Sequence, residues 1–478
     1  MLHELYAPSL ALLTDLYQLT MGYGYWRNRI HHRRAAFHLF FRTCPFQGEY
    51  AIAAGLEPVV QWLTGFEVSS EDVAYLSTLT GNDSKPLFSA DFLKAIDGMR
   101  LTVDIDSMPE GSLVFANQPI LRVTGPLWQC QWIETALLNL VNFQTLIATK
   151  ASRVCEAARG ERVLEFGLRR AQGIDGALSA SRAAHLGGCS ATSNVLAGRL
   201  LGIPVRGTHA HSWVMSFDDE LSSFNAYADA LPNNCVFLVD TYDTLDGVRN
   251  AIQVAQRLRR DGHEMLGIRL DSGDLAELSI AARQLLDEAG FEDASIVASN
   301  DLDELEILRL KKAGAKIAVW GVGTNLVTAR DQPALGGVYK LGAIEDDSGE
   351  WQPRIKLSEL AIKTSTPGIQ QVRRYFRDGK MLGDVIWSEL LGEPKADASV
   401  IDGADSYEDL LRPVLREGRL VTAIPSLMKA RDYAQQCLEQ LGPPTKRLVD
   451  PRVYPVMLDA KLAEQKQQMI DASSNGTG

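Results

Sequence analysis

The chain has 478 residues, of which 46% are hydrophobic and 23% are charged, and its formal net charge is −12. These values predict a folded protein with a large buried core, about three domains by length alone, although a single barrel breaks that rule. The acidic balance argues against nucleic acid as the main partner, while a local basic pocket for phosphate stays compatible with it.

The cysteines and the N-terminal residues indicate the cellular compartment of the protein. Its six cysteines are far apart and none forms a CxxC pair, so we expect reduced, mostly buried thiols in a cytoplasmic protein. The first twenty residues include Glu4 and Asp15 and lack a basic stretch before an apolar one, which predicts no signal peptide. No apolar run approaches the about 18 residues of a membrane helix, so we expect no membrane partner.

Residues 1–150 mix helical and strand patterns, which predicts an N-terminal α+β domain. Apolar residues recur at helical spacing over 9–26 and over 127–160, the latter forming one or two long helices. Residues 35–42 resemble a strand, and 100–125 resemble the short strands of an antiparallel sheet.

Residues 151–334 repeat a different pattern, in which a short apolar strand is followed by an amphipathic helix. This pattern is typical of βα units, and the fully apolar strands indicate a parallel sheet covered by helices. An open doubly wound sheet and a closed or irregular barrel both fit it. The predicted strands are 162–167, 203–208, 236–240, 266–270, 295–299 and 316–321.

Strand patterns return over 335–425, with a hairpin signal at 377–380, and we expect these strands to join the N-terminal domain. Residues 426–478 are predicted to form a C-terminal helical extension and tail, of which 472–478 are expected to be disordered.

Residues that follow the strands of the βα region carry most of the candidate chemistry. In an open sheet or a barrel, ligands bind at the carboxyl ends of parallel strands, so these residues are expected to meet. They supply imidazole, carboxylate, guanidinium and hydroxyl groups and a glycine-rich turn. The segments are 166–170, 208–211, 240–243, 269–274, 299–301 and 321–325.

Two histidines stand out within residues 204–217, which read PVRGTHAHSWVMSF. In an extended backbone His209 and His211 would point the same way, which fits a strand end that opens into a pocket. A neutral imidazole can act as a base, a ligand or a nucleophile, while a purely structural role is the alternative. The other histidines are scattered without a CxxC or HExxH spacing, which argues against a histidine metal site.

Phosphate chemistry is indicated by residues 321–324, which read GVGT after an apolar strand. Such a turn lets backbone N–H groups face an anion, although a plain tight turn has the same sequence. Asp240 and Asp271 suggest Mg²⁺ held partly through substrate oxygens. Asp271 and the serine after it are also good helix caps, and we expect them to begin the next helix. Arg169 and Arg269 could pair with carboxylate or phosphate.

Eight segments together resemble the nicotinate phosphoribosyltransferase family, a type II phosphoribosyltransferase family, in the order in which that family carries them, over residues 14–341. The segments are TDLYQLTMGYGY, FFRTCPFQGEYAIAAGL, EFGLRRAQG, GTHAHSWV, LVDTYDT, GIRLDSGDL, VASNDLDE and GVGTNLVTARDQPALGGVYKL. The expected fold is then an irregular α/β barrel of parallel strands, with an α+β domain built from the N-terminal region and the strands after the barrel.

The resemblance implies an ATP-coupled glycosyl transfer, classed as a carbon–nitrogen ligase. Nicotinate and phosphoribosyl pyrophosphate would give nicotinate mononucleotide and pyrophosphate, the first step of NAD salvage from nicotinate. ATP hydrolysis would be coupled through a phosphohistidine, which the GTxAH match places at His211, while His209 falls on a variable position and is expected to be non-essential.

The resemblance also implies roles for individual residues. Tyr17 and Phe166 would sandwich the pyridine ring, and Tyr17 would come from a second subunit of a homodimer. His211, Asp240 and Asp271 would be catalytic, and the two aspartates are also the tentative Mg²⁺ ligands. The substrate would contact Tyr17, Phe166, Arg169, Thr208 and Arg269, and the phosphoribosyl donor would contact Gly273, Asn300, Gly321, Gly323 and Thr324.

Four rival functions were compared with these residues. The sister enzyme that uses nicotinamide has an N-terminal motif similar to TDSYK, where this chain has TDLYQ. That enzyme also places an aspartate near the position of Ser193, and an aspartate there would repel an acidic substrate. Quinolinate phosphoribosyltransferase has a shorter chain without the phosphohistidine motif. A silent pyridine-nucleotide-binding protein would be indicated by loss of His211, Asp271 or the GVGT turn, which are all present. A Schiff-base aldolase would need a lysine at a strand end, and the predicted strand ends carry none.

Overall fold

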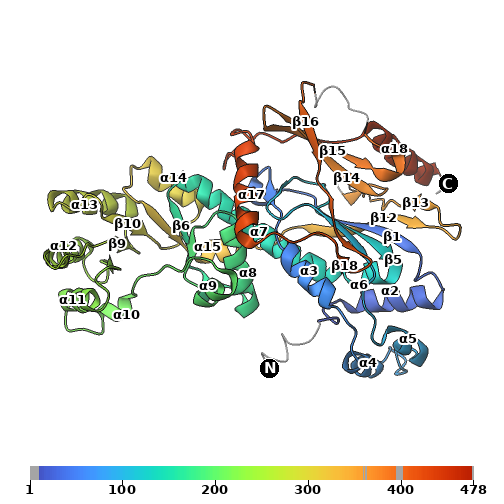
Figure 1. Ribbon diagram of the computed structural model, residues 1–478, viewed down its shortest axis with the longest axis horizontal. Helices are drawn as coiled ribbons and strands as arrows, with labels where there is room; N and C mark the ends of the chain where they lie inside the picture. Colours follow the sequence, from blue (N-terminus) through green and yellow to red (C-terminus); the bar gives the residue numbers. More distant parts are fainter. Residues whose placement is uncertain (1–9, 359, 361–362, 395–401, 476–478) are drawn as a thin grey trace. The chain divides into compact units, whose positions relative to one another are not determined.

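The computed structural model describes residues 10–358, 360, 363–394 and 402–475 (Figure 1). Contacts between residues divide the chain into two compact units. The first unit combines Met1–Thr145 with Ala334–Gly478, and the second is Leu146–Pro333. Each unit has its own sheets and its own core, and the two are described separately.

The first unit is built on a seven-stranded sheet with the order β13-β12-β1-β5-β3-β17-β18, in which every pairing is antiparallel. The three N-terminal strands β1, β5 and β3 lie in the middle of this sheet, and strands from after residue 334 flank them on both sides, so that β1 lies directly beside β12 (Figure 1). The strands are β1 (Arg34–Phe41), β3 (Asp104–Ser107), β5 (Leu121–Pro126), β12 (Gly337–Glu345), β13 (Trp351–Pro353), β17 (Arg412–Arg416) and β18 (Arg419–Leu420). The predicted strands at 35–42 and 100–125 are therefore confirmed, and the sheet is antiparallel as expected.

Two smaller sheets complete the strands of the first unit. A four-stranded sheet has the order β16-β14-β15-β19, and β2 pairs with β4. Asp378 and Gly379 join β14 to β15 with positive φ angles of 50° and 69°, the backbone that an Asp-Gly hairpin turn requires, which confirms the hairpin signal. The strands are β2 (Ala51–Ile52), β4 (Leu113–Val114), β14 (Gln370–Arg377), β15 (Lys380–Ser388), β16 (Ser406–Asp409) and β19 (Val456–Leu458).

A fully buried ion pair joins the two strands of this hairpin. Arg374 donates to both oxygens of Asp384 at 2.9 and 2.7 Å, and it also donates to the carbonyl of Leu113 at 2.9 Å. Gln118 and the hydroxyl of Tyr454 donate to the same carboxylate at 2.7 and 2.8 Å. The Asp384 carboxylate therefore accepts four hydrogen bonds from groups inside the protein, and such pairing is the condition for burying a charge.

The helices of the first unit differ from the predictions mainly at their ends. The helix expected over 9–26 begins only at Leu16. Of the one or two helices expected over 127–160 the structure has two, with Ile133 between them. The prediction of disorder over 472–478 is wrong for 472–475, because these residues continue α18. Residues 476–478 lie outside the described residues. The helices are α2 (Leu16–Arg27), α3 (Leu56–Gly65), α4 (Ser70–Ser77), α5 (Ala90–Ile96), α6 (Leu127–Trp132), α17 (Leu427–Gln440) and α18 (Ala460–Asn475), with 3₁₀ turns η1 (Pro45–Gln47) and η4 (Glu389–Leu391). Helix α7 (Glu134–Ala158) begins in this unit and ends in the second.

The second unit is a mixed α/β structure around a six-stranded parallel sheet with the order β7-β6-β11-β10-β9-β8. This order is the chain order read in a circle, because every strand except β7 pairs with the next one in sequence and β11 pairs with β6. Within the described residues no ladder joins β7 to β8, so the sheet is not closed by strand pairing. The strands are β6 (Arg162–Glu165), β7 (Ala191–Thr192), β8 (Val236–Leu238), β9 (Gly267–Leu270), β10 (Ser295–Ala298) and β11 (Val319–Val322).

The strand predicted over 203–208 is wrong. Its only pairing in the described part of the chain is a single parallel bridge from Val205 to Thr192, and the short strand β7 before it was not predicted. Gly207 and the polar residues after it offer few side chains to pack on both faces of a sheet, so the segment remains a loop. The other five predicted strands of this region are present.

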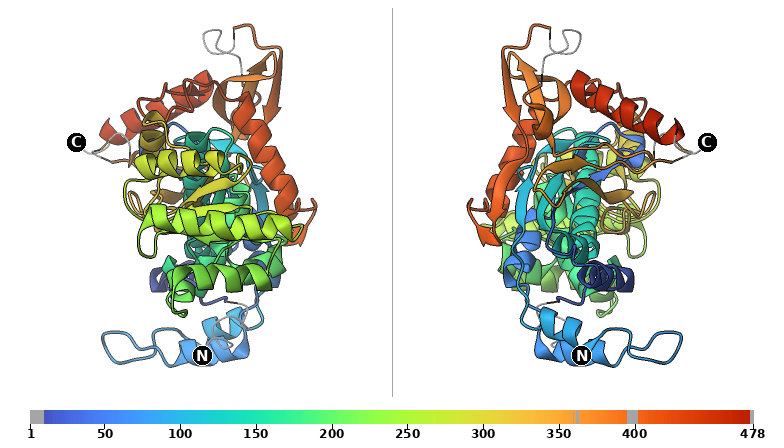
Figure 2. Two further views of the ribbon diagram at one scale, coloured as in Figure 1. Left: turned by 90° about the vertical axis from the view of Figure 1, so that its left-hand side faces the viewer. Right: turned by 90° about the vertical axis from the view of Figure 1, so that its right-hand side faces the viewer.

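Helices separate the strands of this sheet, as the βα pattern predicted, and α11, α12 and α13 lie side by side (Figure 2, left). Asp271 and Ser272 do not cap α13 as expected. Instead Asp274 does, because its Oδ1 accepts from the N–H groups of Ala276 and Glu277 at 2.9 and 3.2 Å. The helices are η2 (Leu168–Arg170), α8 (Gly173–Leu186), α9 (Val195–Leu201), α10 (His211–Val214), α11 (Glu220–Ala230), α12 (Thr244–Arg260), α13 (Leu275–Glu288), α14 (Glu304–Lys312) and α15 (Thr324–Val327).

All six cysteines are free thiols, and four of them are buried. Burial raises the pKa of the Cys235 thiol to about 11, so this sulfur stays protonated at neutral pH. No helix within the described ranges has both the length and the apolar content that crossing a membrane requires.

Candidate active site

A cavity of about 280 Å³ lies at the carboxyl ends of the parallel strands in the second unit. It brings together segments that follow β6, β9, β10 and β11 with the loop around Thr208, as the strand-end argument predicted. The lining residues are Phe166, Arg169, Arg170, Ser193, Gly207, Thr208, His209, Ala210, Arg269, Asp271, Ser299, Asn300, Asp301, Gly321, Gly323 and Thr324. Of the predicted site residues in this unit, His211, Asp240 and Gly273 are outside the lining.

Arg269 and Asp271 form the polar centre of this cavity. The Arg269 guanidinium donates to Asp271 Oδ1 at 2.9 Å, to Ser299 Oγ at 2.8 Å and to Thr208 Oγ1 at 3.4 Å. Ser299 in turn donates to the same oxygen of Asp271. Strand β9 fixes the spacing, because residues two apart on a strand point to the same side. These three contacts therefore hold the guanidinium in one orientation in the cavity lining.

The ionisation of Asp271 follows from these contacts. Partial burial disfavours its charged form, yet the hydrogen bond from Ser299 and the charge of Arg269 together hold the pKa of this carboxyl below its usual value. Asp271 is therefore a carboxylate throughout the neutral range, and its second oxygen is available to a further partner.

That further partner is His211. Its Nε2 lies 3.6 Å from Asp271 Oδ2, and its Nδ1 lies 3.2 Å from Thr241 Oγ1. The His211 side chain is 40% exposed, so the ring is both oriented and accessible. Both ring nitrogens thus have a polar neighbour, which fixes the plane of the ring without burying it.

The two histidines do not point the same way, contrary to the strand-based prediction. The backbone turns into α10 at His211, whereas His209 is buried against Phe224, Tyr227 and Phe237. Burial lowers the pKa of His209 to about 4, so its ring is neutral. Its Nε2 accepts from the backbone N–H of Leu238 at 3.2 Å, which ties the loop before His211 to the edge strand β8.

Asp240 lies beneath this centre. One of its oxygens accepts from the Asp271 backbone N–H and from Ser272 Oγ, both at 2.7 Å. Its other oxygen is buried and has no hydrogen-bond partner among the described residues. No group of three or more His, Cys, Asp or Glu side chains in the described part of the chain is arranged to hold a metal ion. A Mg²⁺ ion at this place would therefore depend on substrate oxygens, as is common for this ion.

Phe166 forms an apolar wall of the cavity, and two glycines make room for it. A Cβ at Gly321 would lie 2.7 Å from ring carbons of Phe166, and one at Gly323 would lie 3.2 Å from the Phe166 carbonyl oxygen. Arg269 lies over the same ring, 5.9 Å from its centroid. The wall therefore offers a flat aromatic face beside a guanidinium group.

The side of the cavity formed by Asn300 and Asp301 has an unusual backbone. Asn300 and Asp301 have φ angles of 94° and 44°, in the left-handed region that non-glycine residues seldom adopt. Asn325, in the helix that begins at Thr324, donates to the Asp301 carbonyl at 2.7 Å and holds this turn in place. Gly273, with a φ of 75°, lines a second hollow with Asn300 next to the cavity.

The sequence analysis missed Glu165, which organises the floor of the site. Its buried carboxylate accepts from the Gly167 backbone N–H, from Ser181 Oγ at 2.9 Å and from Thr192 Oγ1 at 2.6 Å. It thereby fixes the turn that presents Phe166. A glutamate that ends an otherwise apolar strand was the available signal, because a charge placed there needs buried partners. Ser299 and Thr241 lie in the predicted strand-end segments 299–301 and 240–243, but neither was singled out.

Tyr17 belongs to the first unit, on α2, and its side chain is half exposed. Leu13 and Leu16 beside it are also exposed, so this part of the unit presents an apolar patch. The expected contact of Tyr17 with a pyridine ring in a second subunit stays a prediction.

Comparisons with known proteins point to one family. Three family models match consecutive parts of the chain: the N-terminal domain of nicotinate phosphoribosyltransferase at residues 12–142, the nicotinate phosphoribosyltransferase family at 162–378 and the C-terminal domain at 369–466. Nicotinate phosphoribosyltransferase of Bacillus subtilis is 46% identical over 97% of this chain and 95% of its own. The Bos taurus enzyme of that name is 38% identical over 98% and 97%.

A solved structure shows the same likeness over both units. The crystal structure of human nicotinic acid phosphoribosyltransferase is similar with a TM-score of 0.81 and 35% identity, covering 95% of this chain and 99% of the human one. The structure of nicotinate-nucleotide pyrophosphorylase from Pyrococcus furiosus, at a TM-score of 0.70 and 21% identity, shares the fold. The chain therefore belongs to the nicotinate phosphoribosyltransferase family.

Proposed function

We propose that this chain transfers the phosphoribosyl group of phosphoribosyl pyrophosphate to the ring nitrogen of nicotinate. The nitrogen lone pair attacks the anomeric carbon, the bond to pyrophosphate breaks, and nicotinate mononucleotide and pyrophosphate leave. Since the nucleophile needs no deprotonation, the protein's contribution is positioning and stabilisation of charge. The observation that carries this proposal is the cavity in which Phe166, Arg269 and the Gly321–Thr324 turn converge.

The lining of the cavity favours an acid over an amide. Three arginines line it against two aspartates, and one of those aspartates is already paired with Arg269. Ser193, where the nicotinamide enzyme would have an aspartate, is also in the lining and carries no charge. A pyridine carboxylate can therefore lie on Phe166 with its charge toward guanidinium and hydroxyl donors.

His211 is proposed to couple ATP to this transfer. An exposed imidazole with polar neighbours at both nitrogens is a competent nucleophile toward the γ-phosphate of ATP, with ADP as the leaving group. Water would later hydrolyse the phosphohistidine, and the change of charge beside Asp271 and Arg269 would alter how the donor and pyrophosphate bind. When bound, Mg²⁺ would neutralise phosphate charge, and Asp240 and Asp271 are the side chains that would hold it.

Three finer features follow as part of the same proposal. The circular strand order supports an irregular barrel in the second unit, in which the loop tied by His209 takes the place of a strand ladder. The exposed apolar patch around Tyr17 supports a homodimer in which Tyr17 completes the nicotinate site of the partner. The free thiols agree with a cytoplasmic enzyme.

Product formation from labelled nicotinate and labelled nicotinamide, each with and without ATP, tests the function. We expect nicotinate mononucleotide to form with phosphoribosyl pyrophosphate and to form faster when ATP is added. Under the same conditions nicotinamide should react at least about 100-fold more slowly, the discrimination that an unpaired charge in a built site can give. Equal rates for the two pyridines would contradict the assignment, and binding without turnover would favour a silent binding protein.

Replacing Gly321 by alanine should weaken nicotinate binding. The new methyl group would meet ring carbons of Phe166 at 2.7 Å, so the ring must tilt away from the face that it offers. We expect the KM for nicotinate to rise about tenfold, which corresponds to about 1.4 kcal/mol, with a smaller change in kcat. The measurement is steady-state kinetics with nicotinate varied.

The control is Gly176→Ala in α8, where a Cβ meets nothing within 4 Å. This variant should keep the KM of the wild type. An unchanged KM in Gly321→Ala would show that Phe166 does not contact the pyridine.

A further inference from the structure

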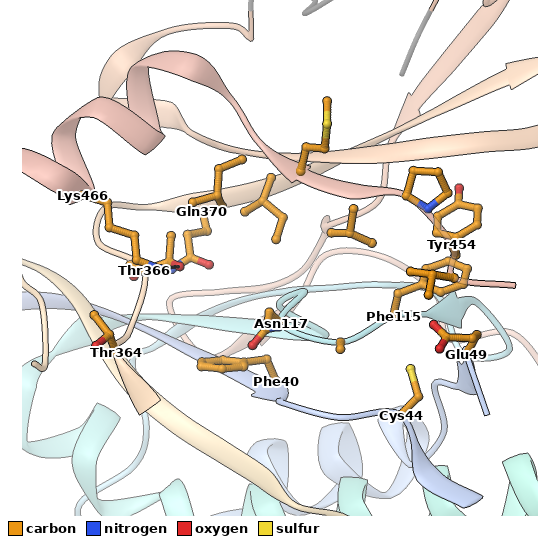
Figure 3. A pocket seen from close by; sticks show the side chains of 17 residues that line it. Phe40, Cys44, Glu49, Phe115, Asn117, Thr364, Thr366, Gln370, Tyr454 and Lys466 are labelled. Carbon is orange, nitrogen blue, oxygen red and sulfur yellow. Dashed lines mark hydrogen bonds between the residues drawn. The ribbon is translucent and has the colours of Figure 1, made fainter. Parts of the chain in front are cut away.

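A second cavity, of about 630 Å³, lies within the first unit between strands β1 and β19 and helix α18 (Figure 3). Its volume is within the range of about 300–1,000 Å³ that is usual for small-molecule sites. The transfer reaction proposed above uses none of its residues. Segments from both ends of the chain build it, since Phe40 belongs to β1 and Lys466 belongs to α18.

One end of this cavity is suited to an anion. Lys466, Thr366 and Gln370 lie together there (Figure 3). Lys466 Nζ donates to Thr366 Oγ1 at 3.3 Å, and this lysine has no carboxylate partner in the part of the chain that the structure describes. Burial alone lowers the pKa of Lys466, so its positive charge lies in a partly desolvated place without compensation. A bound phosphate or carboxylate would supply the missing charge.

The other end is aromatic and acidic. Phe115 and Tyr454 stack there with ring centroids 3.7 Å apart, and Glu49 lies beside them (Figure 3). Burial raises the pKa of Glu49, although the Tyr454 backbone N–H donates to it. This carboxylate would repel an acidic ring and accept a hydrogen bond from an amino group. The floor between the two ends carries the ring of Phe40, which offers a flat apolar surface (Figure 3).

We propose that this cavity binds a nucleoside monophosphate whose base carries an exocyclic amino group, with the phosphate at Lys466 and Thr366 and the amino group at Glu49. We favour this class of ligand over a free pyridine acid for two reasons. The cavity is large enough for a nucleotide, and among the described residues it has a cation without a carboxylate partner at one end and aromatic and acidic groups at the other. Such a site would be separate from the transfer site, and its test does not depend on turnover.

Isothermal titration with adenosine 5′-monophosphate tests this site directly, and inosine 5′-monophosphate is the matched probe. Inosine monophosphate has the same phosphate and nearly the same shape but lacks the amino group. We expect the adenosine form to bind about tenfold more tightly, since its exocyclic amino group donates to Glu49, whereas inosine monophosphate presents a carbonyl oxygen at that position. Inorganic phosphate and nicotinate mononucleotide should bind more weakly than either, and absence of adenosine monophosphate binding would overturn the proposal.

Variants locate the binding. Lys466→Met should weaken adenosine monophosphate binding at least about tenfold, because it removes a charge-assisted contact. Glu49→Gln should reduce the preference over inosine monophosphate. Lys461→Met is the control, since it removes the same charge from α18 outside the cavity lining. Thr366→Val provides a second, uncharged probe of the phosphate end if Lys466→Met melts at a lower temperature than the wild type.

The catalytic cavity is the competing location for the nucleotide. Unchanged affinity in both Lys466→Met and Thr366→Val, with displacement of adenosine monophosphate by phosphoribosyl pyrophosphate, would place the nucleotide there and overturn the proposal. Nicotinate transfer without the nucleotide should be unchanged in Lys466→Met, so loss of binding there would not reflect failure of the proposed function.

Discussion

Replacing His211 by alanine is expected to abolish the ATP-dependent part of nicotinate mononucleotide synthesis. His211 is exposed at the site and is oriented by Asp271 at 3.6 Å and Thr241 at 3.2 Å. Without its ring no nitrogen at that place can accept the γ-phosphate. The rate with ATP should fall at least about 100-fold, which corresponds to about 2.7 kcal/mol of transition-state stabilisation. The rate without ATP should change much less, since nicotinate still has Arg269 and Phe166.

Two measurements separate this role from a structural one. Wild-type protein incubated with γ-³²P-labelled ATP should carry acid-labile label, and the variant should carry none. His263→Ala is the control, because this ring contacts Asn233 in the same unit, away from the cavity lining. Label retained in His211→Ala, or an unchanged response to ATP, would refute the phosphohistidine.

Replacing Asp384 by alanine is expected to destabilise the first unit by about 3–5 kcal/mol, because it leaves the buried guanidinium of Arg374 without its counter-charge. The two side chains are 0% and 1% exposed, and Gln118 and Tyr454 would lose their acceptor as well. Urea denaturation followed by tryptophan fluorescence measures the change in the free energy of unfolding.

The control for this variant is Asp347→Ala, which removes an aspartate that pairs with Arg33 and whose side chain is 87% exposed. Exposed pairs contribute about 0–1 kcal/mol, so this variant should unfold close to the wild type. Equal effects of the two substitutions would show that burial does not set the cost. A double variant, Arg374→Met with Asp384→Leu, should recover part of the lost stability, since it leaves no unpaired charge.

Local sequence patterns were sufficient for most elements of the fold. The βα alternation predicted five of the six parallel strands, and the Asp-Gly signal predicted the β14–β15 hairpin, because burial periodicity and positive φ angles are short-range requirements. The same patterns wrongly predicted a strand at 203–208. It has apolar residues at its start, yet only tertiary neighbours decide whether such a segment finds a strand partner.

The candidate site divides in the same way. The sequence alone determined that imidazole, carboxylate, guanidinium and glycine-rich segments follow parallel strands, so that they must gather at one edge of a sheet. The resemblance assigned the role to His211, but strand periodicity did not determine where each histidine side chain points. Only the tertiary structure buried His209 against three aromatic rings and left His211 beside Asp271, since that choice depends on where α10 begins and on what packs behind the loop. A glutamate at the end of an apolar strand indicated that Glu165 needs buried partners, but only the tertiary structure decided which ones, because Ser181 and Thr192 are 16 and 27 residues away along the chain.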